Sequence, residues 1–149
     1  MKKGYWLIVA LAFLVAGFVS CKKSSSAHVK TKTELLTQSS WKLSTAVAAG
    51  LGDVTSQVPA CSRDNIYTFV SDGTGNINES TNVCAPSQAA SFTWSFLNNE
   101  GTLHLSSTLF TGGSSDFTIN TLNETNLVLS QTVTITPLPA MNVTFTFIH

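Results

Sequence analysis

The stretch Ala-Ala-Ser-Phe-Thr-Trp-Ser-Phe-Leu at residues 89–97 carries the clearest structural signal in the chain. Its large aromatic residues, Phe92, Trp94 and Phe96, alternate with serine and threonine. Successive side chains of a β-strand point to opposite faces of a sheet, so the three aromatic rings share one face. This period of two predicts a strand with one buried face and one solvent-exposed face.

The same alternation recurs on both sides of this stretch, and short turns separate the segments. Asp72-Gly73 is a strong signal for a two-residue hairpin. Short connections require antiparallel neighbours, and a meander of one-faced strands most simply closes into a barrel without free edges. We therefore expect an all-β fold, an eight-stranded antiparallel up-and-down β-barrel over residues 34–149. The other seven strands are expected at residues 41–47, 66–70, around Ile77, 103–105, 117–120, 127–135 and 143–147.

A short helix is expected before the first strand. Residues 31–34, Thr-Lys-Thr-Glu, have the form of a capping box, which predicts a helical turn through Leu36. The turn ends by Ser39-Ser40, and the period then changes from helical to two. In the first strand, the side chains expected on the inner face are Trp41, Leu43, Thr45 and Val47.

Charge is sparse and unevenly distributed. Charged residues make up 11% of the chain and hydrophobic residues 43%. From Glu34 onward, two cations, Lys42 and Arg63, face eight carboxylates, which leaves a formal charge near −6. A nucleic-acid-binding domain needs a basic face, so that class is excluded. The remaining cations all precede Glu34: Lys2, Lys3, Lys22, Lys23, Lys30 and Lys32.

The N-terminus has the pattern of an export signal. Lys2 and Lys3 precede an uninterrupted stretch from Tyr5 to Val19, mostly apolar, which is shorter than the roughly 20 residues of a membrane-spanning helix. A basic start, a short apolar segment and a small residue, here Ser20, are typical of a signal peptide. Residues 1–20 are therefore predicted to be removed.

Ser20-Cys21, directly after the apolar segment, resembles the lipobox of bacterial lipoproteins, although Phe18 stands where an aliphatic residue is usual. The resemblance implies lipid attachment at Cys21, including an acyl chain such as palmitate, and a location in the bacterial cell envelope. A non-acidic Lys22 implies sorting to the outer membrane, facing the periplasm. Residues 21–33 then form a lipidated flexible tether. The alternative is an ordinary signal peptide that leaves Cys21 as a free thiol.

The other two cysteines are expected to pair. The chain has three cysteines. With Cys21 modified, Cys61 and Cys84 remain, and an exported context favours a disulfide between them. The disulfide would close a loop of 24 residues, counting both cysteines, and closing a loop of that length stabilises the fold by about 3.4 kcal/mol. Two cysteines without a neighbouring histidine fall short of a zinc ligand set, so we expect no metal and no cofactor.

Several short segments spread over residues 41–147 carry a second resemblance. They are Trp41-Lys42-Leu43, Cys61-x-x-Asp64-x-x-Tyr67-x-Phe69-x-x-Asp72-Gly73-x-Gly75, Cys84, Phe92-Thr93-Trp94, Asn126-Leu127-Val128-Leu129 and Thr144-Phe145-Thr146-Phe147. Together with Cys21 they resemble the small lipocalin-like domains of bacterial lipoproteins, over about residues 34–149. Ser39 replaces the glycine that usually precedes the first tryptophan, and the late arginine that packs over that tryptophan has no obvious counterpart. The resemblance implies a barrel able to hold a small apolar molecule.

The aromatic residues of the predicted inner faces allow two interpretations. They either contact a small apolar ligand or simply fill the barrel. Gln131 lies on an inner position of its strand and is either a polar anchor or turned outward by a bulge. The candidate ligand contacts are Trp41, Tyr67, Phe69, Phe92, Trp94, Phe96, Phe117, Phe145 and Phe147.

Catalysis is not expected, because no nucleophile, base and orienting group occur at a telling spacing. The serines lie outside any G-x-S-x-G motif. Two other classes stay open. One is a tethered interaction module that binds a protein through residues 48–65 and 80–88. The other is an eight-stranded barrel embedded in the outer membrane, with its apolar face turned to lipid.

Overall fold

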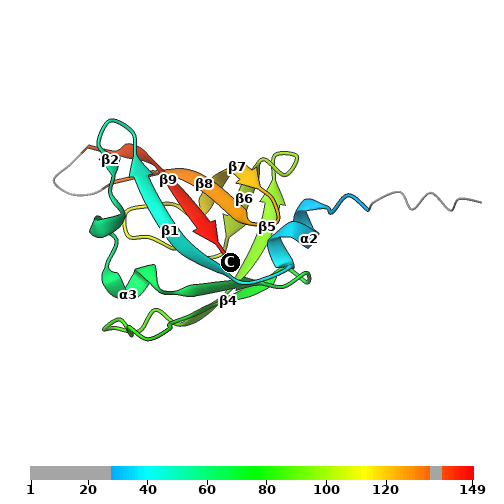
Figure 1. Cartoon of the computed structure of the whole chain (residues 1–149), viewed down its shortest axis with the longest axis horizontal. Coiled ribbons are helices and arrows are strands. Elements are labelled where there is room, and N and C mark those ends of the chain that lie inside the picture. The colour runs from blue at the N-terminus through cyan, green and yellow to red at the C-terminus, as the bar shows by residue number, and fades with distance from the viewer. Residues whose placement is uncertain (1–27, 135–138) are drawn as a thin grey trace, which may run out of the picture.

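The computed structural model describes residues 28–134 and 139–149, and eight of its strands close into an antiparallel barrel (Figure 1). Each strand of the barrel pairs with its neighbour along the chain, and the last strand pairs back with the first. The predicted all-β, up-and-down barrel is therefore confirmed. Its strands are β1 (Trp41–Ala48), β3 (Ile66–Phe69), β4 (Thr74–Asn78), β5 (Ala90–Leu97), β6 (Thr102–Leu105), β7 (Asp116–Leu122), β8 (Asn126–Val133) and β9 (Met141–Ile148).

Three short elements between β1 and β3 were not predicted. They are β2 (Gly52–Asp53), the 3-10 turn η1 (Thr55–Gln57) and the helix α3 (Ala60–Arg63). β1 pairs along its length with β9 but shares only two residue pairs with β3. The chain between them covers the gap: the Val54 amide donates to the Ala46 carbonyl at 2.8 Å, and the Ala46 amide donates to Thr55 Oγ1 at 2.8 Å.

The helix α2 (Lys32–Thr37) closes one end of the barrel. The predicted capping box is present between Thr31 and Glu34, and the helix begins two residues before the expected domain boundary at Glu34. Leu36 is fully buried, and its carbonyl accepts a hydrogen bond from the Trp41 indole at 2.8 Å. These contacts fix α2 across the end of the barrel.

His149 covers Trp41 at the same end. The two rings lie 3.9 Å apart between centroids, and His149 Nδ1 is 2.9 Å from the Ser40 carbonyl. Trp41 is fully buried, although His149 itself is exposed. The His149 imidazole therefore packs over Trp41, the residue for which the sequence has no late arginine as a covering side chain.

The apolar faces of the strands point into the barrel. On β5, Phe92 and Trp94 are buried and Phe96 is half-buried, whereas Ser91, Thr93 and Ser95 are exposed. A barrel embedded in lipid would carry its apolar side chains outward, so the arrangement contradicts that alternative. The inner faces of the other strands contribute Tyr67, Phe69, Leu103, Leu105, Phe117, Leu127, Leu129, Val143, Phe145 and Phe147, all buried.

A β-bulge in β1 overturns part of the predicted pattern. The pairing with β9 shifts between Leu43 and Thr45. The extra residue moves the following side chains to the opposite faces, so Ala46 is fully buried while Val47 is 44% exposed. The expectation that Thr45 and Val47 lie on the inner face is wrong.

Some sequence predictions fall outside the described residues. These are the signal peptide, lipidation at Cys21, most of the tether and the part of the predicted 127–135 strand beyond Thr134. No helix within residues 28–134 or 139–149 has the length and apolar character needed to cross a membrane.

Candidate ligand site at the barrel mouth

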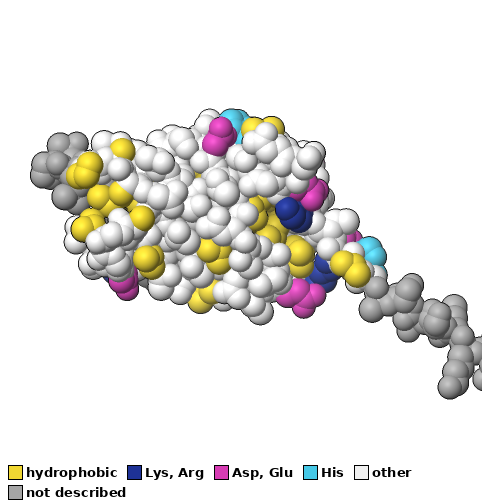
Figure 2. Space-filling model, turned by 90° about the horizontal axis from the view of Figure 1, so that it is seen from above, with side chains coloured by type: hydrophobic (Ala, Val, Ile, Leu, Met, Phe, Trp, Pro, Cys, Tyr) yellow, Lys and Arg dark blue, Asp and Glu magenta, His cyan; other side chains and the backbone are white. Residues whose placement is uncertain are grey.

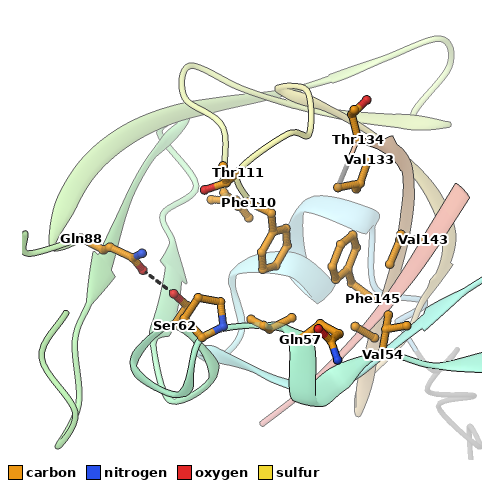
Figure 3. Close-up of a pocket in the computed structure, with 14 residues that line it drawn as sticks. Val54, Gln57, Ser62, Gln88, Phe110, Thr111, Val133, Thr134, Val143 and Phe145 are labelled. Carbon is orange, nitrogen blue, oxygen red and sulfur yellow. Dashed lines mark hydrogen bonds between the residues drawn. The ribbon is translucent and has the colours of Figure 1, made fainter. Parts of the chain in front are cut away.

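A pocket of about 430 Å³ opens at the end of the barrel opposite α2 (Figure 3). Its walls come from the end of β1, the segment 54–59, α3, residues 109–111 and the facing ends of β8 and β9. Small-molecule sites in proteins typically have volumes of about 300–1,000 Å³. The mouth is therefore large enough to enclose part or all of a small ligand.

The apolar wall is built around two stacked phenylalanines. The rings of Phe110 and Phe145 are nearly parallel, at 5°, with centroids 4.2 Å apart. Phe145 comes from β9 and reaches the core through an edge contact with Phe117, whereas Phe110 comes from the long connection between β6 and β7. Figure 3 shows both rings facing into the pocket, with Val54 and Val143 beside them.

The polar wall lies on the other side, where α3 meets the start of β5. Ser62 is buried, and its hydroxyl donates to Gln88 Oε1 at 2.9 Å (Figure 3). Asn65 Nδ2 donates to the same oxygen at 3.0 Å. Asn65 Oδ1 is buried without a hydrogen-bond partner among the described residues. These three residues form an amide–hydroxyl cluster (Ser62, Asn65 and Gln88), of which Ser62 and Gln88 line the mouth.

A disulfide holds the cluster in place. Cys61 and Cys84 are bonded, which confirms the predicted pair. Cys61 precedes Ser62 in α3, and Cys84 belongs to the connection that leads to Gln88. The bond therefore ties both sides of the polar wall together.

Two carboxylates fix the connection between β4 and β5. Glu79 accepts hydrogen bonds from the Ser87 hydroxyl and from the amides of Gln88 and Cys84, at 3.0 and 2.9 Å for the amides. These donors lower the pKa of Glu79, with the Ser87 hydroxyl contributing most. The carboxylate is thus held ionised where it orders residues 79–88.

Asp64, directly after α3, orders the same connection between β4 and β5. Its Oδ2 accepts from the amides of Thr81 and Asn82, at 3.2 and 3.0 Å. The pKa of Asp64 is lowered, mainly by the Asn82 amide. In the sequence, Asp64 was only one residue of a motif. It orders the connection between β4 and β5 through its hydrogen bond with Thr81, 17 residues further along the chain, and no local sequence pattern reveals this contact.

The pocket lining itself is uncharged. None of the described residues that line it is acidic or basic. In the same part of the chain, no group of three or more histidine, cysteine or carboxylate side chains could hold a metal ion. The chemistry available at the mouth is therefore apolar contact and neutral hydrogen bonding.

The nine predicted ligand contacts separate into two sets. Phe145 lines the mouth. The others belong to the packed interior: Trp41, Tyr67, Phe69, Phe92, Trp94, Phe117 and Phe147 are buried, and Phe96 packs against them. Burial raises the pKa of Tyr67 to about 12. The rest of the mouth was not predicted as ligand contacts; it includes Val54, Val58, Ser62, Gln88, Leu109 and Phe110.

Gln131 points inward, and no bulge turns it out. The pairing of β8 with β9 is continuous, and Gln131 is 5% exposed. Its Oε1 accepts from the Ser114 amide at 2.8 Å, while Nε2 has no partner among the described residues. It anchors the turn at residues 112–114 instead of lining the mouth.

Comparison with known proteins agrees with the geometry. The sequence profile of the family described as lipocalin-like domain matches residues 38–129, which run from the end of α2 into β8 and cover more than half of the chain. No curated protein matches the chain. A closed eight-stranded barrel with a pocket at one end, together with this match, shows that the chain belongs to the lipocalin-like domain family.

Proposed function

We propose that the protein binds a small, mainly apolar molecule at the barrel mouth and does not transform it. The observation that supports this is the pocket of about 430 Å³ between the Phe110–Phe145 pair and the amide–hydroxyl cluster. Burial of apolar ligand surface against such walls contributes roughly 25 cal/mol per Å². The uncharged lining fits a binding role.

The test is binding of N-phenyl-1-naphthylamine, an uncharged probe that becomes fluorescent in apolar sites. Thr111 is exposed and lines the mouth, so Thr111→Trp places an indole in the opening. Thr108, on the same connection, is exposed and lies outside the pocket lining, so Thr108→Trp is the matched control. Binding that is weakened by Thr111→Trp alone supports the proposal. Absence of binding, or equal effects of the two variants, refutes it.

We propose further that Cys21 carries the lipid that tethers the barrel in the bacterial cell envelope, at the outer membrane and facing the periplasm. The support is the lipobox-like Ser20-Cys21 after the apolar segment. Cys21→Ser should move the protein from the membrane fraction to the soluble envelope fraction. A variant that stays membrane-bound in high salt would refute the anchor.

The second candidate is an interaction module whose loops bind another envelope protein. Leu51 and Val83, on the loops at the mouth end, are 56% and 67% exposed. Figure 2 shows apolar side chains gathered at the end opposite α2. If this function holds, Leu51→Ser and Val83→Ser together should abolish cross-linking to a partner while leaving probe binding unchanged.

A further inference from the structure

We infer that the mouth selects uncharged ligands with an amide or hydroxyl group and rejects carboxylates of the same chain length. The inference rests on the proposed ligand site. It is carried by the amide–hydroxyl cluster and by the charges around it.

The orientation of the Gln88 amide is fixed by its two donors. Ser62 Oγ and Asn65 Nδ2 both donate to Gln88 Oε1, at 2.9 and 3.0 Å. A carbonyl oxygen has two lone pairs, so Oε1 is fully occupied. The Gln88 nitrogen lies on the other edge of the amide (Figure 3), and among the described residues it donates to no side chain or carbonyl.

The Ser62–Gln88 pair leaves two hydrogen-bonding positions for a ligand, beside the polar side chains of Gln57, Thr111 and Thr134 in the same lining. Gln88 Nε2 offers an N–H donor, and Ser62 Oγ, having given its proton to Gln88, offers a lone pair. A ligand amide matches both, because its carbonyl accepts and its N–H donates. A hydroxyl group also does both. A carboxylate only accepts, so it would leave the Ser62 oxygen facing another acceptor.

Charge adds to this discrimination. The ionised side chains that brace the polar wall are Asp64 and Glu79, both negative. Arg63 follows Ser62 in α3, but it is absent from the pocket lining. Burial of a carboxylate without a cation is strongly unfavourable. A neutral group avoids that cost.

The backbone around the wall is held from outside the pocket, which limits how far the wall can adapt to a ligand. The backbone N–H of Gln88 donates to Glu79 Oε1 at 3.0 Å, and the Cys61–Cys84 bond joins α3 to the connection before β5. Ser62 and Asn65 are 4% and 2% exposed. Hydrogen-bonding groups held in this way penalise a ligand that leaves them unpaired.

The experiment uses displacement of bound N-phenyl-1-naphthylamine by decanamide, 1-decanol and decanoate at pH 8. We expect the amide and the alcohol to displace the probe at concentrations at least about tenfold below that needed for decanoate. In Gln88→Leu, which keeps the side-chain size, the concentrations of decanoate and decanamide needed to displace the probe should become nearly equal. Gln38→Leu, at the closed end, is the control.

Each outcome has one meaning. Equal displacement by decanoate and decanamide overturns the inference and leaves the ligand site standing. Decanoate binding that disappears in Arg63→Ala also overturns it, because the guanidinium would then recognise the ligand. Failure of the probe to bind, or binding unaffected by Thr111→Trp, instead refutes the ligand site itself.

Discussion

Replacement of Trp94 by alanine tests the assignment of the inner face of β5. The side chain is 8% exposed, and its ring makes edge contacts with Phe69 and Phe96 at centroid distances of 5.9 and 5.3 Å. The indole N–H also donates to the carbonyls of Val70 and Thr74, at 3.0 and 2.9 Å. The substitution therefore removes a large core side chain and a shared hydrogen bond.

The magnitude follows from what each group loses. Truncation of a buried tryptophan costs about 3–5 kcal/mol. The two carbonyls keep other donors, because the Gly73 amide donates to Val70 and the Val70 amide donates to Thr74. No acceptor is left unpaired, so the cost stays within the packing range. Trp94→Phe retains a ring and loses the hydrogen bond, which should cost about 1–2 kcal/mol.

The assay is equilibrium unfolding in urea, followed by far-UV circular dichroism so that the loss of a fluorophore does not matter. Thr93→Ala is the control, since Thr93 is the next residue and its side chain is exposed. That change should cost less than about 0.5 kcal/mol. Similar free-energy losses for Trp94→Ala and Thr93→Ala would show that the register of β5, and with it the barrel interior, is wrongly assigned.

Three further predictions follow from the ends of the barrel. The double variant Cys61→Ser/Cys84→Ser should lose about 3.4 kcal/mol of unfolding free energy and bind N-phenyl-1-naphthylamine more weakly; unchanged probe binding would show that the bond does not shape the mouth. The lowered pKa of Glu79 means that its stabilising contribution is present above the ordinary glutamate pKa of 4.5 and is lost as the pH falls below it. Probe binding should therefore weaken on acidification, and Glu79→Gln should flatten that part of the pH profile; an identical profile in the variant would contradict the role of Glu79. His149→Ala should cost about 0.5–1.5 kcal/mol through the lost ring contact with Trp41, measured by thermal unfolding, and an unchanged melting temperature would show that the imidazole does not close that end.

The barrel could be predicted from sequence because its strands obey a period of two. On β5, β6 and β9, the alternating apolar residues are buried or half-buried and the polar residues between them are exposed or half-buried. In β1, by contrast, the bulge after Leu43 exchanges the faces of the later residues. Alanine at the buried position 46 and valine at the exposed position 47 give no hydrophobic signal for this shift.

The mouth could be predicted only in part: residues 48–65 and 80–88, expected as binding loops, supply Val54, Ser62 and Gln88, but the pocket depends on contacts between connections. The residues of the mouth come from segments without a regular period, for example Val54, Ser62 and Phe110. Their positions depend on the short pairing between β1 and β3, which ends after two residue pairs, and on the disulfide. The aromatic residues that looked most suited to a ligand are mainly used to fill the interior. The strongest clue to the site in the sequence was the number of cysteines. It predicted the Cys61–Cys84 disulfide, which links α3 to the connection before β5.

The pairing of the first and last barrel strands sets how the protein responds to mechanical load. β1 begins and β9 ends at the end closed by α2, and their ladder runs from Lys42–Ile148 to Ala48–Val143. A force that pulls the start of β1 away from the end of β9 loads the Lys42–Ile148 pair before the other pairs of this ladder. Because antiparallel hydrogen bonds lie across the strands, the force breaks them one after another, as in a zipper, and not all at once by sliding. The barrel should therefore open at low force when it is stretched between its ends.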